Sequence, residues 1–430
     1  MSWTICVTNP SPYERNDYVE VNLQKLGVSS ELNESNLRLF RVNFDRSRYE
    51  IPFQIDSVLG HNSPVRILTF LSTQTPASAE DYSQFTAEFE LEQGTPTDFS
   101  TERSKEYLRI DYYYEQPDAN KGDAPFDGYN KDWDPNRSVY GVKIHNGQLR
   151  FYVSLVSHPR VYSAIDYTGS VTSIEFQGDP DPDNDLLSPF EKNRPEKRWG
   201  QLYQLIFFPV PWALDWFTII SLKGKKYDLI WSHYGNIGST ITMRSSEPIL
   251  LEYKCLPYCK PATLTLECYL YRVIHVYPDK PFYLEDIFVL TKEGLSISFR
   301  PYFESEVIFS KKVHKNIVRF EEDIPDYFYL WNSFAGVARG YGFAADSHIR
   351  RLEIGKNDSE QNMIRWRLQD THHNRCINFF MYHGVDCQDY NPYHEIGHYA
   401  WYEQIYKPLE VFPLEIFSTA KRYISLQPSE

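Results

Sequence analysis

The chain has 430 residues, of which 42% are hydrophobic and 24% charged, so it is long enough for one large core or two of medium size. Its formal net charge is −14, which makes nucleic acid and anionic membranes poor partners for the molecule as a whole. Aromatic residues make up 16% of the chain, with 33 tyrosines, which favours sheets and a surface that stacks on planar or sugar-like ligands.

Three features of the sequence bear on where the protein is located: the length of its apolar runs, its N-terminal segment and its cysteines. No run approaches the roughly 18 consecutive apolar residues that a membrane helix needs. Residues 1–17 lack a basic segment followed by an apolar one, so no signal peptide is visible. The six cysteines have no repeated spacing and are interpreted as mostly free thiols. We therefore expect a cytoplasmic protein, or a secreted one if a leader peptide has been removed.

From the N-terminus to the C-terminus, almost every segment of the chain is expected to form a strand. Alternating apolar and polar residues, bounded by Pro, Gly, Ser or Asn, recur at 37–44, 49–59, 65–72, 85–92, 107–115, 139–157, 170–178, 201–210, 215–222, 227–235, 239–244, 249–255 and 262–278. Helical candidates are few, at 98–106, 322–335 and 398–407. This density of strands predicts an all-β fold, either a β-propeller or a stacked β-sandwich (supersandwich) assembly with few short helices.

Two acidic, proline-rich runs suggest how the chain is divided. The run 116–137 separates an N-terminal β unit, 1–115, from a main β domain, 138–430, that carries the predicted site. The alternative is one continuous β fold. The second run, 178–198, contains Asp179, Asp181 and Asp183, which have the oxygen density of a calcium loop but lack its glycine and its final glutamate. A solvated acidic loop is the simpler interpretation of that run.

Five of the chain's 12 histidines lie between residues 371 and 407, at His372, His373, His383, His394 and His398. His394 and His398 belong to an H-E-x-x-H motif, whose spacing on a helix holds zinc with the glutamate as general base. Gln404 stands where the longer zinc motif has its third histidine, and an all-β chain is an unusual carrier for such a helix. A zinc site at this cluster and a set of ordinary hydrogen-bonded histidines are both retained.

The same region contains the residue types of a proton-transfer site. Abstraction of the proton next to a uronate carboxylate needs a neutral His or Tyr as base, a Tyr or His as acid, and an Arg that neutralises the carboxylate. Arg365 and Arg367 alternate on one face of a predicted strand just before the histidines. The catalytic candidates are His372, His373, His383, His398, Tyr399, Arg365 and Arg367. The alternative for the arginines is a solvated sheet face.

Several segments resemble carbohydrate-active all-β modules. The segments are NPSPYERNDYVEV (9–21), EIPFQIDSVLG (50–60), RILTFLS (66–72), GNIGSTITMRSSEPILLEYK (235–254) and YRVIHVYPDKPFYLED (271–286). They are similar to stretches of the β-propeller uronate lyases, such as the ulvan lyases, and of the C-terminal β-domains of α-mannosidases. The chain lacks the early histidine pair of the lyases and has Asn-Ile-Gly (236–238) in place of their P-V-R, so no catalytic residue of that family is assigned.

Together these patterns predict a carbohydrate-active protein. The reaction to test first is that of a polysaccharide lyase, which would cleave a uronate-containing glycan by β-elimination. One alternative is a non-catalytic glycan-binding or assembly protein, and a second is a zinc-dependent hydrolase that uses the HEIGH motif (394–398). The expected partner is an acidic polysaccharide or oligosaccharide, with neither nucleic acid nor membrane.

Overall fold

The computed structural model describes the chain as strands and short connections. The described residues are 2–8, 15–24, 26–60, 63, 65–74, 86–99, 108–115, 126–130, 133–155, 170–179, 202–209, 218–221, 227–235, 237–245, 249–253, 264–278, 280, 282–291, 299–308, 327–334, 337–345, 349–354, 363–368, 373–384, 404–406, 410–412 and 423–425. Beyond residue 287 it describes the path of the backbone and, of the side chains, those of Cys376 and Asn378.

The strands pair in antiparallel fashion and form six sheets, A to F, which confirms the all-β prediction. In spatial order, sheet A contains β27 (Glu410–Phe412), β1 (Ser2–Thr8), β7 (Thr86–Gln93), β3 (Leu37–Val42) and β4 (Arg48–Ile51), and sheet B contains β2 (Arg15–Asn22), β6 (Arg66–Gln74) and β5 (Phe53–Ser57). Sheet C contains β12 (Ser170–Phe176), β11 (Leu149–Ser154), β10 (Val139–His145), β8 (Arg109–Glu115) and β9 (Phe126–Asn130).

The remaining sheets come from the second half of the chain. Sheet E contains β15 (Tyr227–Tyr234), β16 (Ser239–Ser245), β18 (Leu264–Val276), β19 (Phe282–Thr291), β25 (His373–Gly384), β22 (Val337–Ala345) and β21 (Tyr327–Phe334), with β17 (Ile249–Tyr253) paired to β18. Sheet D contains β14 (Thr218–Ser221), β13 (Leu202–Pro209), β20 (Phe299–Ile308), β24 (Met363–Leu368) and β23 (Ile349–Ile354), and sheet F contains β26 (Gln404–Tyr406) and β28 (Tyr423–Ser425).

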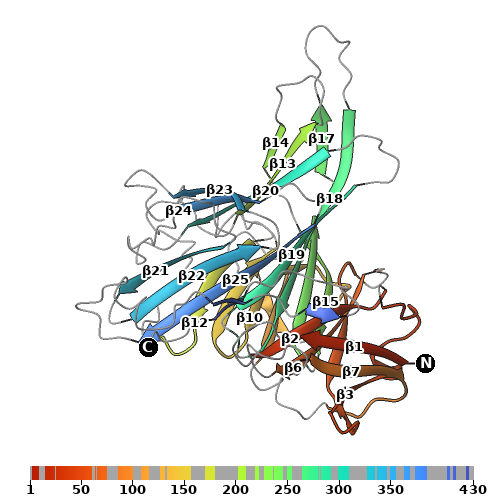
Figure 1. Cartoon of the computed structure of the whole chain (residues 1–430). Helices are drawn as coiled ribbons and strands as arrows, with labels where there is room; N and C mark the ends of the chain where they lie inside the picture. The colour runs from red at the N-terminus through yellow and green to blue at the C-terminus, as the bar shows by residue number, and fades with distance from the viewer. Residues whose placement is uncertain are drawn as a thin grey trace.

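Sheets A and B form an N-terminal sandwich with its own apolar core (Figure 1). Because successive side chains of a strand point to opposite faces, every second residue of β2 and β5 enters this core, for example Val19, Val21 and Ile55. They meet Leu39 and Phe89 of sheet A, which are completely buried. Full burial of each such side chain is worth roughly 1.5–3 kcal/mol, so apolar packing holds the two sheets together.

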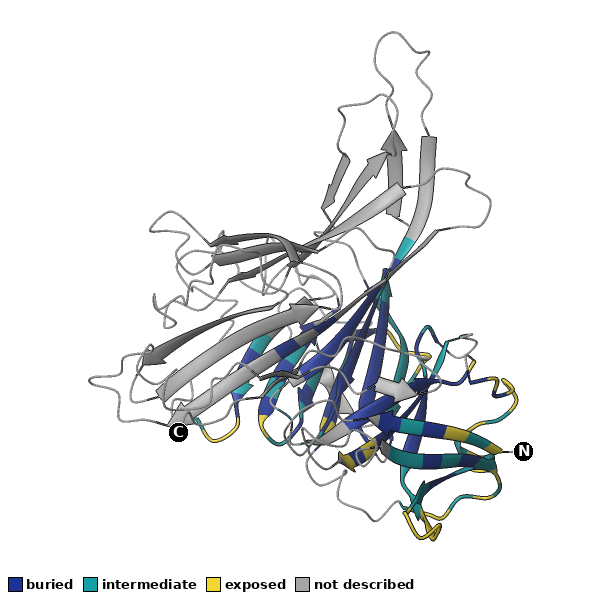
Figure 2. Ribbon diagram, in the orientation of Figure 1, coloured by how far each residue is buried: buried dark blue, intermediate teal, exposed yellow. Residues whose placement is uncertain are grey.

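Sheet E lies between sheet B and sheet C. On one side, Thr242 of β16 donates a hydrogen bond of 2.8 Å to the carbonyl of Val58, just after β5. On the other side, Tyr283 of β19 stacks on Phe151 of sheet C at 5.0 Å between ring centroids. The buried residues therefore concentrate in the central strands (Figure 2). Of the two expected architectures, the structure has the stacked sandwich.

Three expected helices are corrected or fall outside the described residues. The segment 322–335, expected to be a helix, contains strand β21, because YFYLWNSF is rich in aromatic residues that fit a pleated sheet. Strand β26 lies inside the expected helix 398–407. Of the expected helix 98–106, the structure describes only residues 98 and 99, as irregular chain. Within the described segments, the helical element is the 3₁₀ turn η1 (Glu34–Asn36).

The predicted acidic loop 116–137 is where sheet C crosses the expected domain boundary. Strand β9 lies inside this run and pairs with β8, which comes before it. Strand β10, which follows the run, pairs with the other edge of β8. One hydrogen-bonded sheet therefore takes strands from both sides of residues 116–137. The division into 1–115 and 138–430 stays a prediction.

No helix within the described segments is long and apolar enough to cross a membrane.

Candidate functional site

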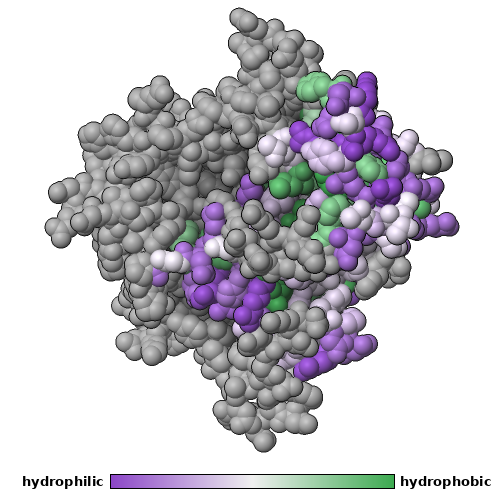
Figure 3. Space-filling view, turned by 90° about the horizontal axis from the view of Figure 1, so that it is seen from below, coloured by the Kyte–Doolittle hydropathy of each residue, from purple (hydrophilic) through white to green (hydrophobic). Residues whose placement is uncertain are grey.

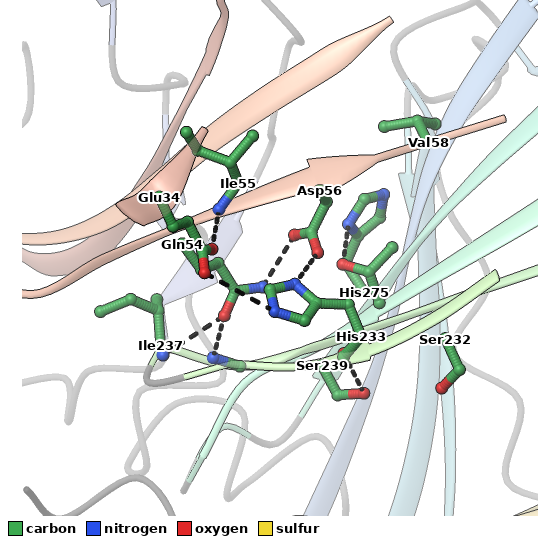
Figure 4. A network of polar contacts seen from close by, with 12 residues as sticks. Glu34, Gln54, Ile55, Asp56, Val58, Ser232, His233, Ile237, Ser239 and His275 are labelled. Atoms are coloured by element: carbon green, nitrogen blue, oxygen red, sulfur yellow. Dashed lines mark hydrogen bonds and ion pairs between the residues drawn. The ribbon is translucent and has the colours of Figure 1, made fainter. Parts of the chain in front are cut away.

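A buried polar layer separates sheet B from sheet E. Among the residues of sheet B that do not enter the sandwich core are Glu20, Gln54 and Asp56, and all three are buried. Uncompensated burial of such groups is costly, so each needs a partner. Figure 4 shows the contacts of Gln54 and Asp56, which are made with β15 and with the turn that leads from β15 to β16.

Gln54 caps the turn between β15 and β16. Its side-chain oxygen accepts hydrogen bonds from the backbone nitrogens of Ile237 at 3.3 Å and Gly238 at 2.8 Å. Its side-chain nitrogen donates to Asp56 at 2.7 Å. A Cβ at Gly235 would lie 2.6 Å from the Gln54 oxygen, so the close approach of Gln54 requires glycine there.

Asp56 orients His233 of β15. The Nδ1 of His233 lies 2.8 Å from Asp56 Oδ1, and its Nε2 lies 3.9 Å from Glu34 Oε2 of η1. Burial lowers the pKa of His233, but the hydrogen bond and charge of Asp56 and the charge of Glu34 outweigh burial and raise it to about 9. Burial raises the pKa of Glu34. His233 is therefore an imidazolium at neutral pH, held between two carboxyl groups.

A second histidine of the layer is sealed from solvent. In sheet E, Thr240 Oγ1 lies 3.2 Å from His275 Nδ1, and His275 Nε2 lies 3.0 Å from Asp286 Oδ2. This hydroxyl, imidazole and carboxylate line up as in a nucleophilic triad. All three residues are only 1% exposed, so no substrate reaches them and the arrangement satisfies buried polar groups. His275 is therefore a packed residue of the core.

The exposed candidate is the outer face of sheet C, defined as the side of β8, β10, β11 and β12 that points away from sheet E. Its described residues are Arg109, Asp111, Tyr113, Gly141, Lys143, His145, Arg150, Tyr152, Ser173 and Glu175. The alternate residues of the same strands, such as Ile144 and Phe151, are buried towards sheet E. Alternation therefore gathers tyrosines and charged groups on one face.

Tyr152 lies across the strand next to it. A Cβ at Gly141 would lie 1.9 Å from the Tyr152 hydroxyl oxygen and 2.3 Å from the ring carbon that carries it, so the phenol occupies the space above Gly141. Tyr113 meets Tyr152 edge to face at 5.8 Å between ring centroids. A partly exposed tyrosine on a sheet combines an apolar ring with a polar tip, as a sugar ring requires.

Ion pairs surround the two tyrosines. Arg150 Nη1 lies 2.8 Å from Glu175 Oε2, and Arg109 Nε lies 2.8 Å from Asp111 Oδ1. Arg150 Nε also donates to His145 Nδ1 at 3.3 Å. Together with Lys143, the face has three cations and two carboxylates among its described side chains.

His145 is the titratable centre of this face. Burial and the nearby charges of Arg150, Lys143 and Arg109 lower its pKa to about 4, although Asp111 opposes them. The imidazole is therefore neutral at physiological pH. Since Nδ1 accepts from Arg150, the ring proton sits on Nε2, which lies 4.0 Å from Asp111 Oδ2.

The structure places four of the predicted catalytic residues in two sheets. Arg365 and Arg367 lie in β24 of sheet D, opposite Glu306 and Glu304 of β20. His373 and His383 lie in β25 of sheet E, ten residues apart, which is roughly 30 Å along an extended strand. A single compact centre therefore contains at most one of these two histidines.

The other predicted positions lie outside the described residues. They are His372, His394, His398 and Tyr399, and with them Asp181 and Asp183 of the acidic run. Asp179, the described member of that run, follows β12. Within the described residues, no group of three or more His, Cys, Asp or Glu side chains is arranged to hold a metal ion. The zinc and calcium sites stay predictions.

Sequence reasoning missed the outer face of sheet C. The signal was present in RIDYYYE (109–115) and LRFYVS (149–154), where charged residues and tyrosines occupy every second position. Gly141 has no such signal, because its role depends on the pairing of β10 with β11.

Comparisons with known proteins find likeness at the level of structure only. No protein-family model matches the chain, and no curated protein matches it in sequence. Among solved structures, it is similar to a protein in the glycosyl hydrolase family 38 from Enterococcus faecalis, with a TM-score of 0.44 and 9% identity over 89% of this chain and 44% of that one.

Two further solved structures are similar to the chain, one over nearly all of it and one over part of it. An α-mannosidase from Enterococcus faecalis has a TM-score of 0.40 and 9% identity over 99% of this chain and 47% of that one. A 4-α-glucanotransferase from Thermococcus litoralis has a TM-score of 0.29 and 11% identity over 58% of this chain and 38% of that one. The chain spans less than half the length of each of these proteins.

Proposed function

We propose that the protein binds an acidic polysaccharide or oligosaccharide on the outer face of sheet C. The observation that carries this proposal is the Tyr152 phenol in the space above Gly141, with Arg150 and Lys143 beside it on the same face. In register, Lys143 is directly opposite Tyr152, so the cation and the ring are neighbours across two strands.

The chemistry of this face matches a sugar that has a negative charge. A pyranose ring stacks its axial C–H groups on an aromatic face, and its hydroxyls find donors and acceptors at the rim. A carboxylate or sulfate on the sugar would bind Arg150 and Lys143, because guanidinium and ammonium groups donate charge-assisted hydrogen bonds to such anions. The described side chains of the face have one positive charge in excess, within a chain whose net charge is −14.

The face is better suited to binding than to proton abstraction. A general base needs an available lone pair, and the Nδ1 lone pair of His145 already accepts from Arg150. A base would also need a pKa nearer neutrality than about 4. These facts favour the glycan-binding alternative at this face over elimination chemistry.

Binding of defined oligosaccharides to matched variants tests the proposal. We expect an oligouronate to bind, and we expect Tyr152→Ala to weaken it about tenfold because the stacking surface is lost. Arg150→Gln should weaken it by a similar factor for the acidic sugar, and leave any neutral sugar nearly unaffected. Calorimetric titration measures both effects.

The chain offers a matched control for Arg150. Arg48, on sheet A, is also 39% exposed and paired with a glutamate, at 2.6 Å from Glu90. Arg48→Gln should therefore leave glycan affinity unchanged. Equal loss in the two arginine variants, or full binding by Tyr152→Ala, would refute a site on sheet C.

The lyase prediction concerns a different part of the chain. It is tested by incubation of the protein with a uronate polysaccharide. If residues 365–399 form an elimination site, a uronate polysaccharide gains the ultraviolet absorbance of an unsaturated product. Stoichiometric zinc that is lost in His394→Ala would instead support the hydrolase alternative. If the glycan binds but neither the absorbance nor the zinc is found, glycan binding is the function that these experiments support.

A further inference from the structure

The contact between the N-terminal sandwich and sheet E differs in kind from the contacts inside the sandwich. Its own core is apolar and is built from residues between Ile5 and Leu91. Where it meets sheet E, the buried apolar cluster consists of Val58, Ile67 and Val273, with two partly buried neighbours. Beyond this cluster, the described contact consists of several hydrogen bonds, an ion pair and one stack of tyrosine rings, and a large polar share is typical of interfaces that form and separate.

Three polar groups of sheet B have specific partners across this layer. Gln54 accepts from the two backbone nitrogens of the β15–β16 turn, and Asp56 holds His233. At the far end, Tyr277 donates a hydrogen bond to Glu20, and its ring stacks on Tyr18 at 4.0 Å between centroids. When polar faces separate, water replaces the lost hydrogen bonds. Apolar faces that separate would be exposed to water without such compensation.

The proton-sensitive contact lies at the rim of the layer. His233 belongs to β15, the edge strand of sheet E, and its side chain is 24% exposed. Among the described residues, Asp56 from β5 and Glu34 from η1 are the titratable groups that face it. From β16, Ser239 donates to the backbone carbonyl of His233 at 3.0 Å. Water therefore reaches an imidazole that is the shared counterion of two carboxyl groups.

We propose that the polar layer is a reversible docking surface, on which the N-terminal sandwich binds to sheet E as a separate module, and that the proton on His233 controls this docking. The partner on this surface is sheet B itself. Strand β27, which pairs with β1 at the edge of sheet A, moves with the sandwich. Loss of the proton leaves Asp56 and Glu34 facing a neutral ring, so the contact weakens.

The direction of the pH dependence follows from the raised pKa of His233. A proton bound more tightly in the docked state stabilises docking fully below the ordinary pKa of 6.5, and the benefit is lost as pH rises through about 9. Since each pH unit between these values is worth a factor of ten, the proton favours docking by at most about 300-fold. The proposal thus predicts release in alkali.

Hydrogen–deuterium exchange of the full-length chain tests this directly. The amides of Ile237 and Gly238 are bonded to Gln54 only when the sandwich is docked. The amides of β7, such as that of Phe89, report on the sandwich itself. At neutral pH, Asp56→Asn should speed exchange at 237–238 by about tenfold and leave β7 unchanged. In the unaltered protein, the same selective loss should occur as pH rises through about 9.

A second variant keeps the proposal testable if Asp56→Asn does not fold. His233→Gln retains a hydrogen-bond donor but does not titrate, so the alkaline loss of protection at 237–238, measured relative to β7, should disappear. Arg48→Gln, on the far side of sheet A, should keep that loss. If 237–238 and β7 lose protection together, or if the alkaline loss persists in His233→Gln, proton-controlled docking is wrong.

Discussion

At the scale of single residues, the candidate glycan site depends on the absence of a side chain. Gly141 leaves the space that the Tyr152 phenol fills, and its backbone is not in a conformation that requires glycine. The reason for glycine is therefore the close approach of the ring. Aromatic rings that cover a glycine on a neighbouring strand also protect that weak point of a sheet.

This arrangement predicts that Gly141→Ala displaces Tyr152. The added methyl would overlap the phenol, so we expect a stability loss of about 1–3 kcal/mol, as in overpacked sites, together with weaker glycan binding. Chemical denaturation and calorimetric titration measure the two effects.

A double variant separates the clash from other effects of the alanine. In a Tyr152→Ala background, Gly141→Ala should cost little in stability, because the clashing ring is gone. The same cost in both backgrounds would show that the ring does not occupy the space above Gly141.

At the scale of strands, sheet E contains a charge pair whose role is structural. Arg272 of β18 and Glu285 of β19 lie 2.5 Å apart, on the face of sheet E that is turned towards sheet C, and both are buried. Removal of one partner leaves the other charge without compensation in a medium of low dielectric constant.

We expect Glu285→Gln to destabilise the protein by about 3–5 kcal/mol, because Arg272 would keep its buried charge. The exposed pair of Arg150 and Glu175 provides the comparison, since such pairs contribute about 0–1 kcal/mol. Thermal or urea unfolding of Glu285→Gln and Glu175→Gln measures the difference. Similar losses in both would contradict the assignment of a buried pair.

The strands could be predicted from sequence because alternation is a local property. The expected segments 65–72 and 85–92 correspond to β6 and β7 within a few residues. The helix expected at 322–335 was wrong because short aromatic segments do not distinguish the two periods, and pairing of β21 with β22 decides the outcome.

The candidate sites could not be predicted in the same way. His233 and Asp56 are 177 residues apart, and nothing local indicates that Gln54, Asp56 and the β15–β16 turn meet. The resemblance to carbohydrate-active modules did rest on 50–60, 235–254 and 271–286, which provide much of the described polar layer. Those motifs therefore mark how sheet B and sheet E fit together.

At the scale of the whole molecule, the stacked sheets present several different surfaces. Sheet A exposes a network of ion pairs, such as that of Arg48 with Glu90. Sheet B buries a polar face against sheet E. The described surface seen in Figure 3 is mainly hydrophilic, with smaller apolar areas. Large exposed hydrophobic side chains among the described residues are Phe44, Tyr49 and Leu71. The outer face of sheet C combines partly exposed tyrosines with an excess of cations.

Footprinting of tyrosines by hydroxyl radicals in the presence of an oligouronate tests the central claim most directly, because it locates the bound sugar. Tyr113 and Tyr152 should lose most of their reactivity when the sugar binds, while Tyr49, which is 48% exposed on β4, should keep its reactivity. Unchanged oxidation of Tyr113 and Tyr152 at a sugar concentration that saturates binding would contradict a glycan site on sheet C.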